Sequence, residues 1–122
     1  MKRRSVLAAG VLAASTLLAA CGGGGGGAAQ DLSVTAVQGF KYDPNTWTMK
    51  SGQAYKVTLH NNDPTQAHTW VVPELGSTWK LRAEAGKTVS KTLTPNKTGT
   101  FQVECDEPGH KDAGMTGTLT VS

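Results

Sequence analysis

The chain has 122 residues, with twelve Lys and Arg against nine Asp and Glu, and 6% of its residues are aromatic. The excess of three positive charges lies entirely at Lys2, Arg3 and Arg4, so the rest of the chain is formally neutral and has no basic cluster. This charge distribution excludes a nucleic-acid-binding surface, and the length excludes two domains with separate cores.

The first twenty residues have the pattern of a secretory signal peptide. The basic residues at positions 2–4 precede an apolar stretch, Val6 to Ala20, that is too short and too close to the terminus for a membrane span. The stretch ends in Leu18-Ala19-Ala20-Cys21, which resembles the bacterial lipobox, in which the Cys is lipidated and becomes the first residue of the mature protein. We expect a signal peptide over residues 1–20 and a lipid on Cys21. Ordinary cleavage after small residues is the alternative.

Residues 21–30 predict a flexible tether. Six consecutive glycines, from Gly22 to Gly27, are followed by Ala28, Ala29 and Gln30, and this segment cannot pack a core. A Gly-rich linker of this size has an end-to-end distance of roughly 15–18 Å and stretches to about 30 Å. We therefore expect one domain over residues 31–122, held close to an extracytoplasmic membrane surface, either periplasmic or on the outer face of a bacterial envelope.

The spacing of turn residues predicts that this domain is all-β. Segments rich in Thr and Val are separated by turn sequences such as Asn61–Pro64 and Thr94–Asn96, roughly every eight to twelve residues, which is typical of a β-sandwich or barrel. In the segment 89–93 the apolar phase includes Lys91, which predicts an edge strand or a bulge. Only residues 81–85 have a pattern that suits a helical turn. The clearest strand candidates are 32–36, 55–59, 70–72, 101–103 and 119–121.

Strand phase places Cys105 inside the domain. Successive side chains of a strand alternate between faces, so Cys105 lies on the same face as the apolar Phe101 and Val103. If Cys21 is lipidated, Cys105 has no partner for an intramolecular disulfide. An unpaired Cys in an exported protein indicates an intermolecular disulfide, a buried inert thiol or a metal ligand.

The same count separates two histidines. His68 shares a face with Trp70, so we expect it to be buried at the start of its strand, close to a buried Trp. His60 is in phase with Lys56 and Thr58, which predicts a place on the solvent face and no role as a ligand.

Cys105, His110 and Met115 follow one another with the spacing C-x4-H-x4-M, and His68 lies upstream on another expected strand. Taken singly, Cys105 is more often a buried thiol without a function and His110 a solvated loop residue. Met115 is more often a core residue, and His68 a buried His whose nitrogens are hydrogen-bonded within the protein. Together they form a His2Cys set with a weak Met, which is the donor set of blue-copper electron-transfer sites. The Pro108-Gly109 pair helps the loop to curl back between its two ligands.

The segment from Phe40 to Val121 resembles a cupredoxin of the plastocyanin/azurin kind, exported as a lipoprotein, with a ligand spacing similar to that of auracyanin and rusticyanin. The resemblance implies a Greek-key β-sandwich or barrel of about seven or eight strands and one type 1 copper per chain. It implies equatorial ligands at His68, Cys105 and His110, an axial ligand at Met115, and an electron exit through His110. The matching residues are Phe40, Pro44, Gly52, the Asn-rich turn before His68, Trp70-Val71-Val72, Gly99-Thr100-Phe101, CDEPGHKDAGM at 105–115 and Gly117–Val121.

One position departs from the family pattern. The family often has Asn directly after the first ligand His, where it connects the two ligand loops, and this chain has Thr69. A hydroxyl offers fewer donors than an amide, so we expect looser support around the metal. We count Thr69, Trp70, Pro108 and Gly109 among the residues that surround the ligands.

These observations predict a membrane-tethered carrier of single electrons, which is not an enzyme and has no small-molecule substrate. Redox proteins are the expected partners, docking near His110, where Glu107, Lys111 and Asp112 mix both signs of charge. Copper delivery or storage is the main alternative, although Met49 and Met115 are the only methionines after the expected signal. A metal-free binding module is a third possibility, against which the complete ligand set argues.

Overall fold

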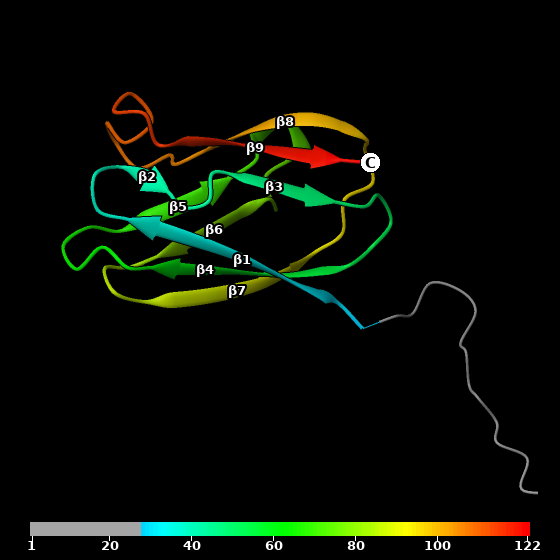
Figure 1. Ribbon diagram of the computed structural model, residues 1–122, viewed down its shortest axis with the longest axis horizontal. Coiled ribbons are helices and arrows are strands. Elements are labelled where there is room, and N and C mark those ends of the chain that lie inside the picture. The colour runs from blue at the N-terminus through cyan, green and yellow to red at the C-terminus, as the bar shows by residue number, and fades with distance from the viewer. Residues whose placement is uncertain (1–27) are drawn as a thin grey trace, which may run out of the picture.

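The computed structural model of the protein describes residues 28–122, so the expected signal peptide, Cys21 and the glycine run lie outside the described residues (Figure 1). The expected all-β fold is confirmed, with nine strands in the described part instead of about seven or eight. The larger number reflects short strands such as β2, which has two residues. The elements are β1 (Gln30–Val37), β2 (Lys41–Tyr42), β3 (Thr46–Met49), β4 (Tyr55–Asn61), β5 (His68–Val71), the 3-10 turn η1 (Pro73–Leu75), β6 (Lys80–Ala83), β7 (Thr88–Leu93), β8 (Gly99–Glu104) and β9 (Thr116–Val121).

The strands form two sheets that pack face to face. One sheet has four strands in the order β2-β1-β4-β7, and the other has five in the order β3-β9-β8-β5-β6. Two pairs of neighbours, β1 with β4 and β3 with β9, are parallel, and the remaining pairs are antiparallel. The segment expected to be an edge strand is β7, which lies at an edge of the four-stranded sheet.

The core fills the space between the sheets with the residues that alternation predicts. Val34 and Leu59 face inward from the four-stranded sheet, and Val103 and Leu119 face inward from the other. The indole of Trp70, fully buried, packs edge-on against Trp47 with ring centroids 5.8 Å apart. An edge-to-face aromatic pair contributes about 0.5–1.5 kcal/mol beyond the area that it buries.

One local prediction was wrong. Residues 81–85 suited a helical turn by pattern, but residues 80–83 form strand β6, which pairs with β5 in the register His68 to Ala83 and Trp70 to Leu81. Leu81 and Ala83 are buried while Lys80 and Arg82 are exposed, so the alternation of a strand is present but covers only four residues. Tertiary pairing with β5 therefore decides the conformation of this segment.

The chain enters the domain at the end opposite the expected ligands. Strand β1 begins at Gln30 at the same end of the domain as the C-terminus, whereas the loop after β8 and the loop before β5 lie at the other end (Figure 1). Between Ala28 and Ser122 the chain forms no apolar helix of the length that a bilayer crossing needs.

Candidate metal centre

Cys105 follows the last residue of β8 and lies inside the domain, as its phase predicted. Phe101, Val103 and Cys105 are 3%, 0% and 0% exposed. The thiol forms no disulfide within the described residues. Its backbone N–H donates to the carbonyl oxygen of Met115 at 3.1 Å. This hydrogen bond connects the two ends of residues 105–115, which we call the ligand loop.

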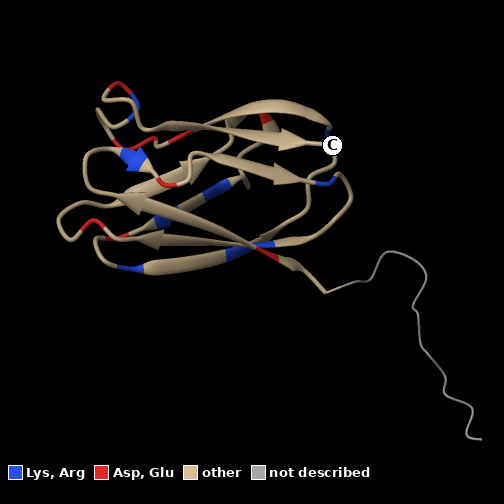
Figure 2. Ribbon diagram, viewed as in Figure 1, with Lys and Arg blue, Asp and Glu red and all other residues tan. Residues whose placement is uncertain are grey.

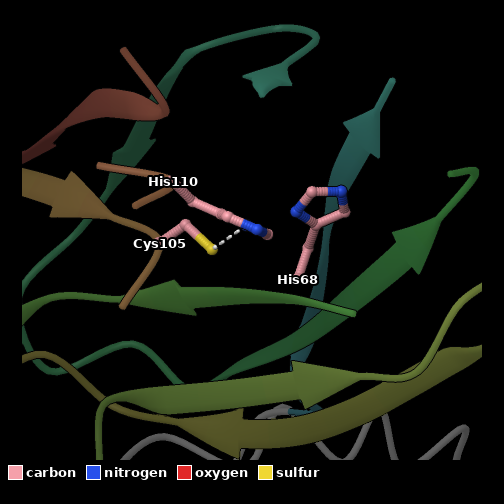
Figure 3. Close-up of side chains that lie close together, drawn as sticks. All are labelled: His68, Cys105 and His110. Carbon is pink, nitrogen blue, oxygen red and sulfur yellow. Dashed lines mark hydrogen bonds between the residues drawn. The ribbon is translucent and has the colours of Figure 1, made fainter. Parts of the chain in front are cut away.

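The structure brings together His68 from β5 with Cys105 and His110 from the loop between β8 and β9 (Figure 3). One donor atom from each residue lies within 4.8 Å of the other two, and all three residues are buried. Nδ1 of His110 is 3.4 Å from the sulfur of Cys105, and the two imidazole rings have centroids 4.9 Å apart. Two nitrogens and one sulfur thus converge on one small interior space.

The loop that carries His110 and Met115 is a series of tight turns. The N–H of His110 donates to the carbonyl of Glu107 at 3.1 Å, and the N–H of Met115 donates to the carbonyl of His110 at 3.1 Å. Pro108 and Gly109 lie exposed in the first turn, where Gly109 has a φ of 81° that favours glycine. Met115 is fully buried at the end of the loop. The turns therefore hold His110 and Met115 at a fixed separation from Cys105.

Thr69 connects the two ligand segments. Its backbone N–H donates to the sulfur of Cys105 at 3.3 Å, and its hydroxyl donates to Oδ1 of Asp106 at 2.8 Å. The same hydroxyl oxygen accepts the N–H of Asp106 at 2.8 Å. It also lies 3.5 Å from the sulfur, but its single proton is directed to the nearer carboxylate. The sulfur thus receives one hydrogen bond from Thr69, and the expectation of looser support stays a prediction.

His68 has one free nitrogen and one occupied nitrogen. Its Nε2 is 2.8 Å from Oδ2 of Asp63, whereas its Nδ1 is buried and finds no hydrogen-bond partner among residues 28–122. Figure 3 shows one ring nitrogen of His68 facing Cys105 and His110 and the other turned away from them. Burial acts to raise the pKa of Asp63, but hydrogen bonds from His68 and Thr65 outweigh it and lower the pKa to about 2.

This arrangement fits a copper ion. A buried nitrogen without a partner costs free energy, and a metal ion in the space that Cys105 and His110 also face would remove that cost. Thiolate and thioether favour Cu(I), while imidazole suits both oxidation states, so the donor set of His68, Cys105, His110 and Met115 is that of a type 1 copper site.

His110 is the ligand candidate nearest the surface. It is 7% exposed, against 0% for His68 and Cys105. Burial, and then the nearby His68, lower the pKa of His110, which favours the neutral imidazole that can bind a metal. Phe40 packs edge-on against it, with ring centroids 4.8 Å apart. Phe40, which packs against His110, adopts a φ of 58°, which is unusual for a residue other than glycine.

Two other residues singled out from the sequence are Trp70 and His60. Trp70 is fully buried, but its ring contacts are with Trp47 and Trp79 in the core. His60 is half-buried on the outer face of β4, where the hydroxyl of Thr88 lies 3.4 Å from its Nδ1, and it does not belong to the cluster. The difference in burial between His60 and His68 therefore agrees with their strand phase.

Ion pairs hold the ligand loop from outside. Glu104 pairs with Lys111 and Asp106 with Lys80, each at 2.6 Å, and Glu107 pairs with Arg82 at 2.7 Å. Burial acts to raise the pKa of Asp106, but the hydrogen bonds from Lys80 and Thr69 outweigh it and keep the pKa below its ordinary value. Basic and acidic residues are interspersed over the domain (Figure 2).

Sequence reasoning missed two residues that support the ligands, Asp63 and Asp106. Both have short polar side chains within five residues of an expected ligand, which is the available signal. Asp63 was assigned only to a turn, and Asp106 was not distinguished from its loop neighbours.

Solved structures share this fold at low sequence identity. Auracyanin from the photosynthetic bacterium Roseiflexus castenholzii, in a dithionite-reduced form, aligns with a TM-score of 0.69 and 22% identity over 79% of this chain and 99% of that one. Auracyanin A is a blue copper protein of the green thermophilic photosynthetic bacterium Chloroflexus aurantiacus. It aligns with a TM-score of 0.66 and 19% identity over 78% of this chain and 100% of that one. The metal-binding domain of the Cu(I)-exporting P-type ATPase of Streptococcus pneumoniae, solved with Cu(I), aligns with a TM-score of 0.59 and 18% identity over 75% of this chain and 84% of that one.

No curated protein matches the sequence. A family model described as a cupredoxin-like domain matches residues 6–121, which is nearly the whole chain. The protein therefore belongs to the cupredoxin-like domain family.

Proposed function

We propose that this protein is a membrane-tethered type 1 copper protein that carries single electrons between redox partners of the bacterial envelope. The observation that carries the proposal is the convergence of His68, Cys105 and His110, whose donor atoms lie within 4.8 Å of one another in a buried space. The similarity of the fold to auracyanins, one of them described as a blue copper protein, supports the same conclusion.

Bound copper would supply a one-electron couple between Cu(II) and Cu(I). The chain's part is to keep the donors fixed and dry, so that little rearrangement accompanies the transfer of the electron. A backbone hydrogen bond connects Cys105 with Met115, and His68 and Cys105 are fully buried. His110, being nearest the surface, is the residue through which we expect the electron to enter and leave.

The test is the colour and electrochemistry of the Cu(II)-loaded protein. We expect an intense thiolate-to-copper charge-transfer band and a reversible one-electron couple. Cys105→Ser removes the thiolate and should abolish the band, while His60→Ala, on the outer face of β4, should leave it intact. A colourless Cu(II) protein, or a couple that is not reversible, would refute the electron-carrier function.

Copper delivery is the second candidate, because the fold also resembles the metal-binding domain solved with Cu(I). Delivery requires coordination that exchanges readily, whereas the three candidate ligands here are buried. The two functions differ in the rate at which Cu(I) passes to a competing chelator. We expect transfer over hours, and transfer within seconds would favour delivery.

The tether and anchor belong to the same proposal. A lipid on Cys21 would attach on the side where β1 begins at Gln30, so we expect the opposite end of the domain, which carries the loop between β8 and β9, to be accessible to partners (Figure 1). Mass spectrometry of the protein purified from membranes should show a lipidated Cys21 at the N-terminus. Cys21→Ser should release the protein into the soluble fraction, and a variant that stays in the membrane would contradict the anchor.

We propose that redox proteins dock over His110. Glu107 and Lys111, on either side of it in the chain, are each held in an ion pair, so an apolar contact that includes Phe40 is favoured over steering by charge. Electron self-exchange should therefore change little between low and high ionic strength. A steep dependence on salt would contradict this docking mode.

A further inference from the structure

Two buried polar side chains build the loop between β4 and β5. Asn61 is 1% exposed, and its amide nitrogen lies 2.8 Å from the carbonyl oxygen of Gln66 and 3.1 Å from those of Ala83 and Glu84. Its side-chain oxygen accepts the N–H of Asp63 at 3.0 Å. Asn61 therefore fixes the loop to the end of β6 and sets the position of Asp63.

Within residues 28–122, the polar contacts of the Asp63 carboxylate are with Thr65 and His68. Oδ1 accepts the N–H of Thr65 at 2.9 Å and its hydroxyl at 2.8 Å, and Oδ2 lies 2.8 Å from Nε2 of His68. Asp63 and His68 are 2% and 0% exposed, so water does not compete for this contact. The carboxylate can only accept, which requires the proton of the neutral imidazole to be on Nε2.

We propose that Asp63 is the positioning residue of the copper site: it fixes the tautomer of His68, directs Nδ1 toward Cys105 and favours the oxidised site with a buried negative charge. This inference rests on the proposed function for its redox part. Its structural part, the tautomer, concerns the protein without metal.

Two physical effects act in the same direction. A carboxylate that accepts the second N–H of a ligating His makes the imidazole more basic, and the loss of such a partner typically costs about 10–100-fold in metal affinity. A buried negative charge also interacts more favourably with Cu(II) than with Cu(I), because the oxidised ion carries one more positive charge and the interior screens poorly. Asp63 should therefore stabilise the oxidised form more and lower the reduction potential.

A role in loop formation alone is the competing explanation, and Asp63→Asn separates the two. The Asn side chain keeps the shape of the loop and an oxygen for Thr65, but it places an NH2 group against Nε2 of His68. Thr65→Ala is the matched control, because it removes a hydrogen bond to the other carboxylate oxygen and leaves the pair with His68 in place.

The first measurement is the tautomer of His68 in the metal-free protein, from long-range 1H–15N NMR spectra. We expect the Nε2–H tautomer in the wild type and in Thr65→Ala, and its loss in Asp63→Asn. An Nδ1–H tautomer in the wild type would overturn the proposal even if no Asp63 variant folds. This result does not depend on whether the protein carries electrons.

The second measurement is the affinity for Cu(II) and Cu(I), together with the reduction potential. We expect Asp63→Asn to bind Cu(II) about 10–100-fold more weakly, with a smaller loss for Cu(I). The potential should rise by about 59 mV for each factor of ten by which the Cu(II) loss exceeds the Cu(I) loss. An unchanged potential in a folded Asp63→Asn protein, or an equal rise in Thr65→Ala, would overturn the redox part. Absence of a copper couple in the wild type would instead refute the proposed function.

Discussion

The hydroxyl of Thr69 is the clearest link between the two ligand segments, and Thr69→Val removes only this group. Val keeps the β-branched shape, the strand conformation and the backbone N–H that donates to the sulfur of Cys105 at 3.3 Å. The variant loses two hydrogen bonds of 2.8 Å, one to the carboxylate of Asp106 and one from its N–H. The change therefore tests the connection between the segments without altering a ligand.

The expected loss follows from the surroundings of the two groups. Thr69 is fully buried, whereas the side chain of Asp106 is 38% exposed and keeps Lys80 as a partner. Water can replace the hydroxyl at the carboxylate, but the N–H of Asp106 loses its partner, and an unsatisfied donor of this kind costs about 1–3 kcal/mol. We expect the free energy of unfolding to fall by about 1–2 kcal/mol, which lowers the Tm by roughly 4–16 °C for a domain of this size.

The assay is chemical and thermal denaturation of the metal-free domain, with Thr69→Ser as the control that keeps the hydroxyl. Thr69→Ser should lose less than Thr69→Val, because both hydrogen bonds can still form. A loss below about 0.5 kcal/mol in Thr69→Val, which is the ordinary range for surface substitutions, would refute the assigned role of the hydroxyl.

Three further predictions concern the packing at Gly117, the binding of copper and the replacement of Thr69 by Asn. Gly117→Ala should destabilise the protein by about 1–3 kcal/mol, because the added Cβ would lie 2.5 Å from the carbonyl oxygen of Asn45 and 2.6 Å from the ring of Trp47, and denaturation measures this directly. Copper at a hundredfold excess over its Kd should raise the stability by about 2.7 kcal/mol, an increase seen in the Tm that Cys105→Ser should not show. Thr69→Asn should change the reduction potential or the retention of copper, and no change in either would contradict the expected looseness.

Alternation was sufficient to place two of the four ligand candidates, Cys105 and His68, on the buried face. The phase of Phe101 and Val103 placed Cys105 inside, and the phase of Trp70 placed His68 inside, because a strand with one buried face has only one register that buries its apolar residues. The segment 81–85 was mistaken for a helical turn because four residues are too few for a period to be recognised. Its pairing with β5 is a contact between strands that a local pattern does not contain.

The surroundings of the ligands were harder to predict, for a different reason. Asp63 was expected in a turn and lies in the loop after β4, but its carboxylate reaches His68 because Asn61 fixes this loop against the end of β6, more than twenty residues away in the chain. The role of Thr69 likewise depends on Asp106, which strand pairing brings beside it. Hydrogen bonds of this kind form only in the packed fold, so residue type and spacing point to the ligand candidates but not to the residues that support them.

The fold also determines which charged residues around the ligand loop form ion pairs. The sequence showed mixed signs near His110, and the structure pairs Glu107 and Asp106 with Arg82 and Lys80 of β6. Exposed pairs of this type contribute little to stability individually, about 0–1 kcal/mol each. Together the two pairs restrain the position of the loop, because they hold Asp106 and Glu107, directly after Cys105, to strand β6. Charges that pair in this way are not available to attract a partner, so the same contacts that restrain the loop also leave the surface around His110 without a strong field.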